Sequence, residues 1–165
     1  MVKESTEDQE KDVEEEEPFE NTPSDLDEIT HAELRLMHER SSEAILFAKN
    51  IQWRSVGASL LVFGALIAIA FFGSADKSLV KLLGVLSILL ACGVIFVLVM
   101  YQFWQFNEIG RIVEVERYFS SLYLKIRDIK SQREGNLHRY ALLLFMIIVV
   151  VTGALVSNLV IKRML

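Results

Sequence analysis

The sequence predicts an all-α integral membrane protein with three transmembrane helices, and three charge-free hydrophobic runs carry that prediction. They cover residues 55–75, 82–107 and 140–161, and each is close to the ~20 residues that a helix needs to cross a bilayer. Composition agrees, because 52% of the 165 residues are hydrophobic and the mean hydropathy is +0.35. A soluble domain of this length is less apolar, so we expect lipid to cover much of the surface.

Charge divides the chain into an acidic start and a mildly basic remainder. Residues 1–28 hold thirteen Asp/Glu and two Lys, a net of −11, whereas residues 29–165 hold nine Asp/Glu and fifteen Lys/Arg, a net of +6. Segment 1–24 has too few apolar side chains to offset its ordering entropy, which predicts a disordered acidic tail. It either solvates the protein or serves as an acidic arm for a partner. It does not read as a signal peptide, so we expect the first span to direct insertion.

Residues 25–54 predict a cytoplasmic amphipathic helix that leads into the first span. Ser24 is a suitable cap, and Asp27 and Glu28 favour the positive end of the helix dipole. Neither Pro nor Gly interrupts the segment, and apolar side chains recur at helical spacing. These are Leu34, Met37, Ala44, Ala48 and Ile51.

The expected transmembrane helices are 55–73, 79–104 and 140–161, and the first two are close enough to form a helical hairpin. Each contains two small residues four positions apart, a spacing that lets helix backbones approach closely. The pairs are Gly64 and Ala68, Ser87 and Ala91, and Gly153 and Ser157. Three such pairs favour a packed bundle over three separate anchors.

Amphipathic side chains mark the membrane interface, and Lys and Arg set the orientation. The interface residues are Trp53, Arg54, Trp104, Arg139 and Tyr140, which suit head-group depth. The N-terminal side and the connection 105–139 together carry ten Lys/Arg near the spans, against four on the other face. This excess predicts a cytoplasmic N-terminus and a C-terminus outside.

The connection between the second and third spans contains a predicted amphipathic helix over 109–134. Its apolar residues, here called the stripe, alternate by three and four: Ile112, Val115, Phe119, Leu122, Ile126 and Ile129. Since the stripe is continuous, we expect a break near 107–110 and one helix along the membrane surface. A second break at Ser120 and Ser121, giving a hairpin, is the alternative. The stripe would be covered by the 26–53 helix, by another protomer or by lipid head groups.

Motifs that carry chemistry are absent from the sequence: there is no GxGxxG, Walker loop, HExxH, CxxC or GxSxG. His31 and His38 share a helix face, but a metal site needs three or more ligands. Cys92 is the only cysteine, and no ionisable residue lies deep in a span, which disfavours a proton relay or ion-coupled transporter. We therefore predict no catalytic, cofactor-binding or metal-binding residue, no nucleic-acid partner and no small-molecule substrate.

Residues 33–64 resemble small, largely uncharacterised bacterial multipass proteins in which a helix with a "FAK–QWR"-like end enters the first span. The matching residues are 47–49 and 52–54, in a stretch of about a fifth of the chain. The layout is also similar to SLATT membrane effectors, although those lack the third span. The resemblance implies a bacterial inner membrane and supplies no site residues.

The sequence favours a non-enzymatic scaffold or accessory subunit, which assembles with copies of itself or with other membrane-protein subunits. An oligomeric pore-forming effector is the alternative. A pore needs a polar lining, and the spans offer few candidates: Ser59, Ser87, Thr152, Ser157 and Asn158.

Overall fold

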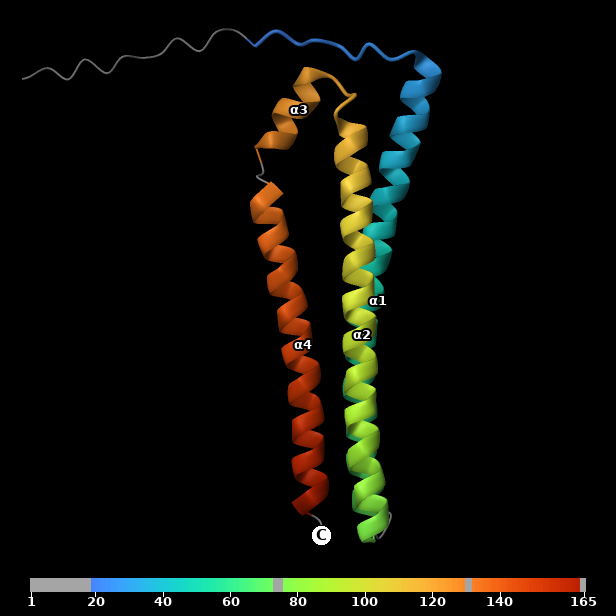
Figure 1. Ribbon diagram of the computed structural model, residues 1–165, viewed down its shortest axis with the longest axis vertical. Helices are drawn as coiled ribbons and strands as arrows, with labels where there is room; N and C mark the ends of the chain where they lie inside the picture. Colours follow the sequence, from blue (N-terminus) through green and yellow to red (C-terminus); the bar gives the residue numbers. More distant parts are fainter. Residues whose placement is uncertain (1–18, 73–75, 130–131, 164–165) are drawn as a thin grey trace, which may run out of the picture.

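The computed structural model describes residues 19–72, 76–129 and 132–163, and every regular element in these ranges is a helix. The helices are α1 (Glu28–Phe72), α2 (Lys77–Glu116), α3 (Ser121–Asp128) and α4 (Gln132–Arg163). Helices α1, α2 and α4 run side by side, and α3 lies at the end where α1 begins and α2 stops (Figure 1). The predicted all-α class is confirmed.

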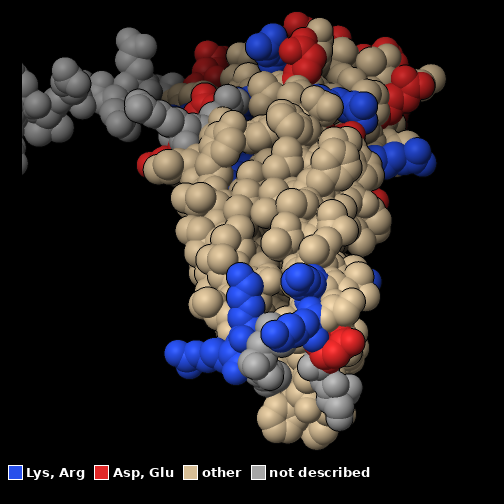
Figure 2. Space-filling view, turned by 60° about the horizontal axis from the view of Figure 1, so that its bottom comes forward, with Lys and Arg blue, Asp and Glu red and all other residues tan. Residues whose placement is uncertain are grey.

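Three of these helices are long and apolar enough to cross a membrane: α1, α2 and the Glu134–Arg163 part of α4. Figure 2 shows a wide band without Lys, Arg, Asp or Glu between the charged side chains of the two ends. At 1.5 Å per residue, the 45 residues of α1 span about 68 Å, roughly twice the ~30 Å hydrocarbon thickness of a bilayer. The first half of α1 therefore extends beyond the apolar band.

Two buried glutamines fix the register of the antiparallel pair α1–α2. Gln52 Nε2 donates to the carbonyl oxygen of Leu98 at 2.8 Å, and Gln105 Nε2 donates to Gln52 Oε1 at 2.9 Å. Apolar side chains from three helices fill the core below this level, with Phe63 of α1, Leu98 of α2 and Met146 of α4 among the most buried. The three apolar helices thus form one bundle.

Helix α4 packs against both α1 and α2, and it uses two of the three predicted small-residue pairs. Ser87, Ala91 and Ser157 are buried, and a Cβ built on Gly153 would lie 2.9 Å from Phe63 Cδ2. Gly64 and Ala68 are instead exposed. The buried face of α1 follows positions 56, 59, 63, 66 and 70, so positions 64 and 68 lie beside that face and outside the core.

The connection breaks later than expected. Helix α2 continues through Gly110 to Glu116, whereas the preferred arrangement ends it at 107–110. A glycine inside a helix costs only about 1 kcal/mol, and the last turn of α2 buries both Val115 and Glu116. The break falls where Ser120 caps α3, its side chain accepting from the backbone N–H of Tyr123. The chain therefore resembles the alternative, a short hairpin.

Residues 19–24 belong to the predicted disordered tail, yet they pair with the start of α3. The backbone N–H of Thr22 donates to Ser121 Oγ at 2.8 Å, and the N–H of Ser121 donates to the Thr22 carbonyl oxygen at 3.1 Å. The rest of the tail, 1–18, lies outside the described residues. A short segment can order here because its polar groups bond to α3 in place of water.

Asp27 caps α1 in place of the expected Ser24. Its Oδ1 accepts from the N–H groups of Ile29 and Thr30, both at 3.0 Å. The bonds from Thr30, its hydroxyl first, lower the pKa of Asp27 because they favour the charged carboxylate. Ser24 Oγ instead donates to the carbonyl oxygen of Tyr118 at 2.8 Å, which draws residues 19–24 towards the α2–α3 turn.

We predict that Gly153→Ala destabilises the bundle, because the buried ring of Phe63 has to move away from the new Cβ. Overpacking of this kind lowers the free energy of unfolding by about 1–3 kcal/mol. The matched control is Gly64→Ala, since a Cβ on Gly64 meets nothing within 4 Å. Unfolding of both variants in mixed micelles measures the difference. Equal effects would contradict the α1–α4 packing described above.

Candidate functional site

Glu116 is the centre of a polar cluster in the head, a name used here for residues 19–54 and 105–129. Its carboxylate is largely buried at the end of α2. The Tyr123 hydroxyl donates to Oε1 at 2.9 Å, His38 Nε2 lies 3.3 Å from the same oxygen, and an Arg127 guanidinium nitrogen lies 3.3 Å from Oε2. One carboxylate therefore joins α1, α2 and α3.

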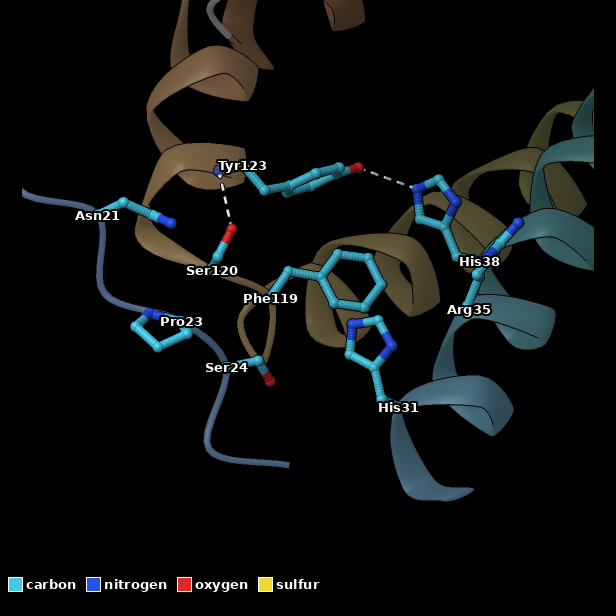
Figure 3. Close-up of a pocket in the computed structure, with 9 residues that line it drawn as sticks. All are labelled: Asn21, Pro23, Ser24, His31, Arg35, His38, Phe119, Ser120 and Tyr123. Atoms are coloured by element: carbon cyan, nitrogen blue, oxygen red, sulfur yellow. Dashed lines mark hydrogen bonds between the residues drawn. The ribbon is translucent and has the colours of Figure 1, made fainter. Parts of the chain in front are cut away.

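Phe119 occupies the turn between α2 and α3 and packs in the centre of an aromatic cluster. Its ring centroid lies 5.6 Å from that of His31, 6.1 Å from that of His38 and 5.0 Å from that of Tyr123. Figure 3 shows the Phe119 side chain pointing towards the two histidines of α1, with Tyr123 above it. The α2–α3 turn is thus anchored on α1 by one apolar side chain and one carboxylate.

An open pocket of about 420 Å³ lies against this cluster. Nine residues from three segments line it: Asn21, Pro23, Ser24, His31, Arg35, His38, Phe119, Ser120 and Tyr123 (Figure 3). Among the described residues, the lining includes Arg35 and two histidines but no acidic side chain. It therefore offers cationic and aromatic groups to whatever enters.

The hydroxyls in this pocket are engaged in holding the head together. Ser24 donates to the Tyr118 carbonyl oxygen, and Ser120 accepts from the Tyr123 backbone. Burial, followed by the hydrogen bond and negative charge of Glu116, raises the pKa of Tyr123 to about 12. The phenol therefore stays protonated at neutral pH and acts as a hydrogen-bond donor.

The predicted stripe is divided between the inside and the outside of the head. Val115 is buried, Ile112 is half-buried, and Phe119 packs on α1. The remaining three side chains are exposed because α3 starts a new helix with a different rotation. They are Leu122, Ile126 and Ile129, at 43%, 60% and 83% exposure.

The predicted interface residues gather at one level of the bundle. Trp53 neighbours the bonded Gln52, Trp104 neighbours Gln105, and the ring of Tyr140 lies 5.3 Å from that of Phe106. Trp53, Trp104 and Tyr140 are exposed. Arg54 is exposed as well, whereas Arg139 is half-buried. This level is the head-side edge of the charge-free band.

The Glu116 cluster is a functional candidate that the sequence did not reveal. His38 and Glu116 lie 78 positions apart, so no spacing motif connects them. His31 and His38 do share a face of α1, but both pack on Phe119. Among the described residues, no three His, Cys, Asp or Glu side chains gather as metal ligands would. Cys92 is exposed on α2.

No protein-family model, curated protein or solved structure matches this chain.

We predict that Tyr123→Phe lowers the free energy of unfolding by about 1 kcal/mol, the typical loss for one hydrogen bond. Because the folded-state pKa is raised from 10 to about 12, the proton of Tyr123 stabilises the fold fully below pH 10. That stabilisation is lost as the pH rises towards 12. The variant should therefore lose less stability than the wild type over this range.

Tyr118→Phe is the control, since Tyr118 is exposed in the same turn. Ultraviolet absorbance follows phenolate formation in both variants. Only Tyr123→Phe should remove the tyrosine that titrates near pH 12. If Tyr118→Phe removed it, the Glu116–Tyr123 bond would be incorrectly placed.

Proposed function

We propose that this chain is a non-enzymatic three-span membrane protein that acts as a scaffold or accessory subunit of a membrane complex. One observation carries the proposal: α3 exposes Leu122, Ile126 and Ile129 on a head that its own contacts already hold in place. An apolar face presented from a fixed frame suits a protein partner, either another membrane-protein subunit or a second copy of the chain.

Helix length and charge support the placement in a membrane. The three apolar helices are long enough to cross a bilayer interior, and exposed aliphatic and aromatic side chains surround the charge-free band. The head and the start of α4 carry most of the Lys and Arg near the spans, whereas the far end has Lys77, Lys81, Lys162 and Arg163. By the positive-inside rule the head faces the cytoplasm.

The polar side chains that a pore would need are mostly buried inside the bundle. Ser59 Oγ donates to the Val56 carbonyl oxygen, and Asn158 Nδ2 donates to Ser87 Oγ at 3.1 Å. Ser157 is also buried, and Thr152 is the exposed member of the five. Inward-facing polar groups of a three-helix bundle support packing, so we place the pore second and would test it by conductance in liposomes.

We predict opposite labelling of Ser24→Cys and Ser78→Cys in a Cys92→Ser background. Helix α1 separates these two exposed or half-exposed positions. A membrane-impermeant maleimide added to intact cells should label Ser78→Cys, and it should reach Ser24→Cys only after permeabilisation. The reverse result would invert the orientation. Labelling of both positions from one side would contradict the assignment of α1 as a span.

We predict that Ile126→Glu releases the partner without unfolding the protein, since Ile126 is exposed on α3. Arg117→Gln is a matched control because it makes the same change in net charge in the same head. Its ion pair with Glu114 is exposed on both sides and is worth little. Native mass spectrometry of gently extracted protein measures assembly for each variant.

The Phe119→Glu variant tests whether loss of assembly comes from the exposed face of α3 or from loosening of the head that holds α3 in place. Phe119 packs on His31 and His38, so this variant should loosen the head itself and raise hydrogen exchange in the first half of α1. The Ile126→Glu variant should leave that exchange unchanged. A wild-type protein that stays monomeric, with no foreign subunit, would overturn the proposal.

A further inference from the structure

Polar side chains from three helices converge at the head-side edge of the apolar band. Gln52 of α1 and Gln105 of α2 are bonded to each other there. Lys49 lies one turn before Gln52, and Gln102 lies one turn from Gln105 on the same face of α2. Arg139 of α4 comes directly before Tyr140, whose ring packs on Phe106. The group consisting of Lys49, Gln102 and Arg139 is called the polar layer below.

Two side chains of the polar layer lack partners in the part of the chain that the structure describes. Gln102 is only 3% exposed, yet neither its amide nitrogen nor its amide oxygen makes a hydrogen bond. The ammonium nitrogen of Lys49 is buried and also makes none. Buried polar groups almost always have partners, and an unpaired buried charge is costly. The Gln102 amide and the Lys49 ammonium group are therefore available to bind a group from outside the protein.

The charge balance of the polar layer indicates the chemistry of that group. Burial, followed by the positive charge of Arg139, lowers the pKa of Lys49. The described bond of the Arg139 side chain goes to Asn136 Oδ1, a neutral partner. The nearest acidic residue along α2, Glu108, is bonded to Arg111 at 3.1 Å. Among the described residues, neither cation of the polar layer is thus paired with a carboxylate.

We propose that the polar layer binds the phosphate of an anionic phospholipid, with Lys49 and Arg139 contacting the phosphate oxygens and the Gln102 amide donating from the protein side. Cations bind phosphate through short, charge-assisted hydrogen bonds. The proposal rests on the membrane placement argued above, which brings this level to the lipid head groups. Exposed Trp53, Trp104 and Tyr140 surround the same level, as expected for an interface.

The first test measures lipids retained by the full chain. The protein is reconstituted in nanodiscs that contain phosphatidylglycerol and phosphatidylcholine, extracted gently, and weighed by native mass spectrometry. The wild type should retain phosphatidylglycerol selectively. The double variant Lys49→Gln with Arg139→Gln should lower that retention about thirtyfold, because each of the two basic residues contributes about 1 kcal/mol of attraction to anionic lipid.

The control is Arg40→Gln with Arg117→Gln, which removes the same charge from exposed positions of the head that lie away from the interface level. It should retain phosphatidylglycerol like the wild type. If the control lost as much lipid as the double variant, attraction would be general and the site would be overturned. If lipid-free protein in neutral detergent were stabilised by inorganic phosphate equally well, the ligand would be free phosphate.

A second variant separates binding from folding. Gln102→Leu removes a buried unpaired amide, so it should raise or preserve the melting temperature in neutral detergent while lowering phosphatidylglycerol retention several-fold. A structural role for Gln102 predicts a lower melting temperature with unchanged retention, and that result would contradict the proposal. The cysteine labelling above reports insertion separately, so failure of lipid retention with correct labelling would overturn this site alone.

Discussion

The structure depends on a mismatch between the length of α1 and α2 and the length of their apolar parts. Both helices run unbroken for 40 residues or more, yet the charge-free band uses only about half of α1. Inside a helix, backbone N–H and C=O groups bond to each other and need no water. The chain therefore leaves the apolar band at the lowest cost in unsatisfied hydrogen bonds when the helix simply continues. The segments of α1 and α2 beyond the band carry charged side chains, and they still have to pack against each other. The head is the result, since α1 and α2 stay together there while α3 returns the chain to α4.

The architecture of the apolar band could be predicted from the sequence, because lipid-compatible helices need long runs without charge and such runs are easy to recognise. The course of the connection could not. Gly110 suggested an end to α2, but the burial of Val115 and Glu116 against α1 outweighs the cost of a helical glycine. The serines before α3 lie inside a continuous apolar stripe, and the sequence does not show that Ser120 turns its side chain to the backbone.

The candidate sites depend on contacts between distant segments, which explains why sequence patterns indicated them poorly. Gln102 and Gln105 lie at the end of a predicted span, where polar residues usually face head groups. Their burial follows from the rotation of α2 against α1, which the Gln52 bonds fix. The pair Gly64 and Ala68 illustrates the same limit, because small-residue spacing identifies a face of a helix but not which face meets a neighbour.

Two polar clusters in one protein show how hydrogen bonding separates a structural group from a group available for binding. Glu116 is buried and has three partners, which are His38 of α1 and both Tyr123 and Arg127 of α3. The chain itself supplies partners for the buried Glu116 carboxylate. That carboxylate therefore joins three helices and has little hydrogen-bonding capacity left for a ligand. Gln102 is buried to a similar degree, and the Lys49 ammonium nitrogen is buried as well, both without such compensation. Leaving them unpaired costs free energy that an apolar substitution would recover, and the anion proposed for the polar layer would recover it by binding. The first cluster fixes the position of α3 and its exposed side chains, and in our proposal the second sets how the same bundle sits against the lipid phosphates.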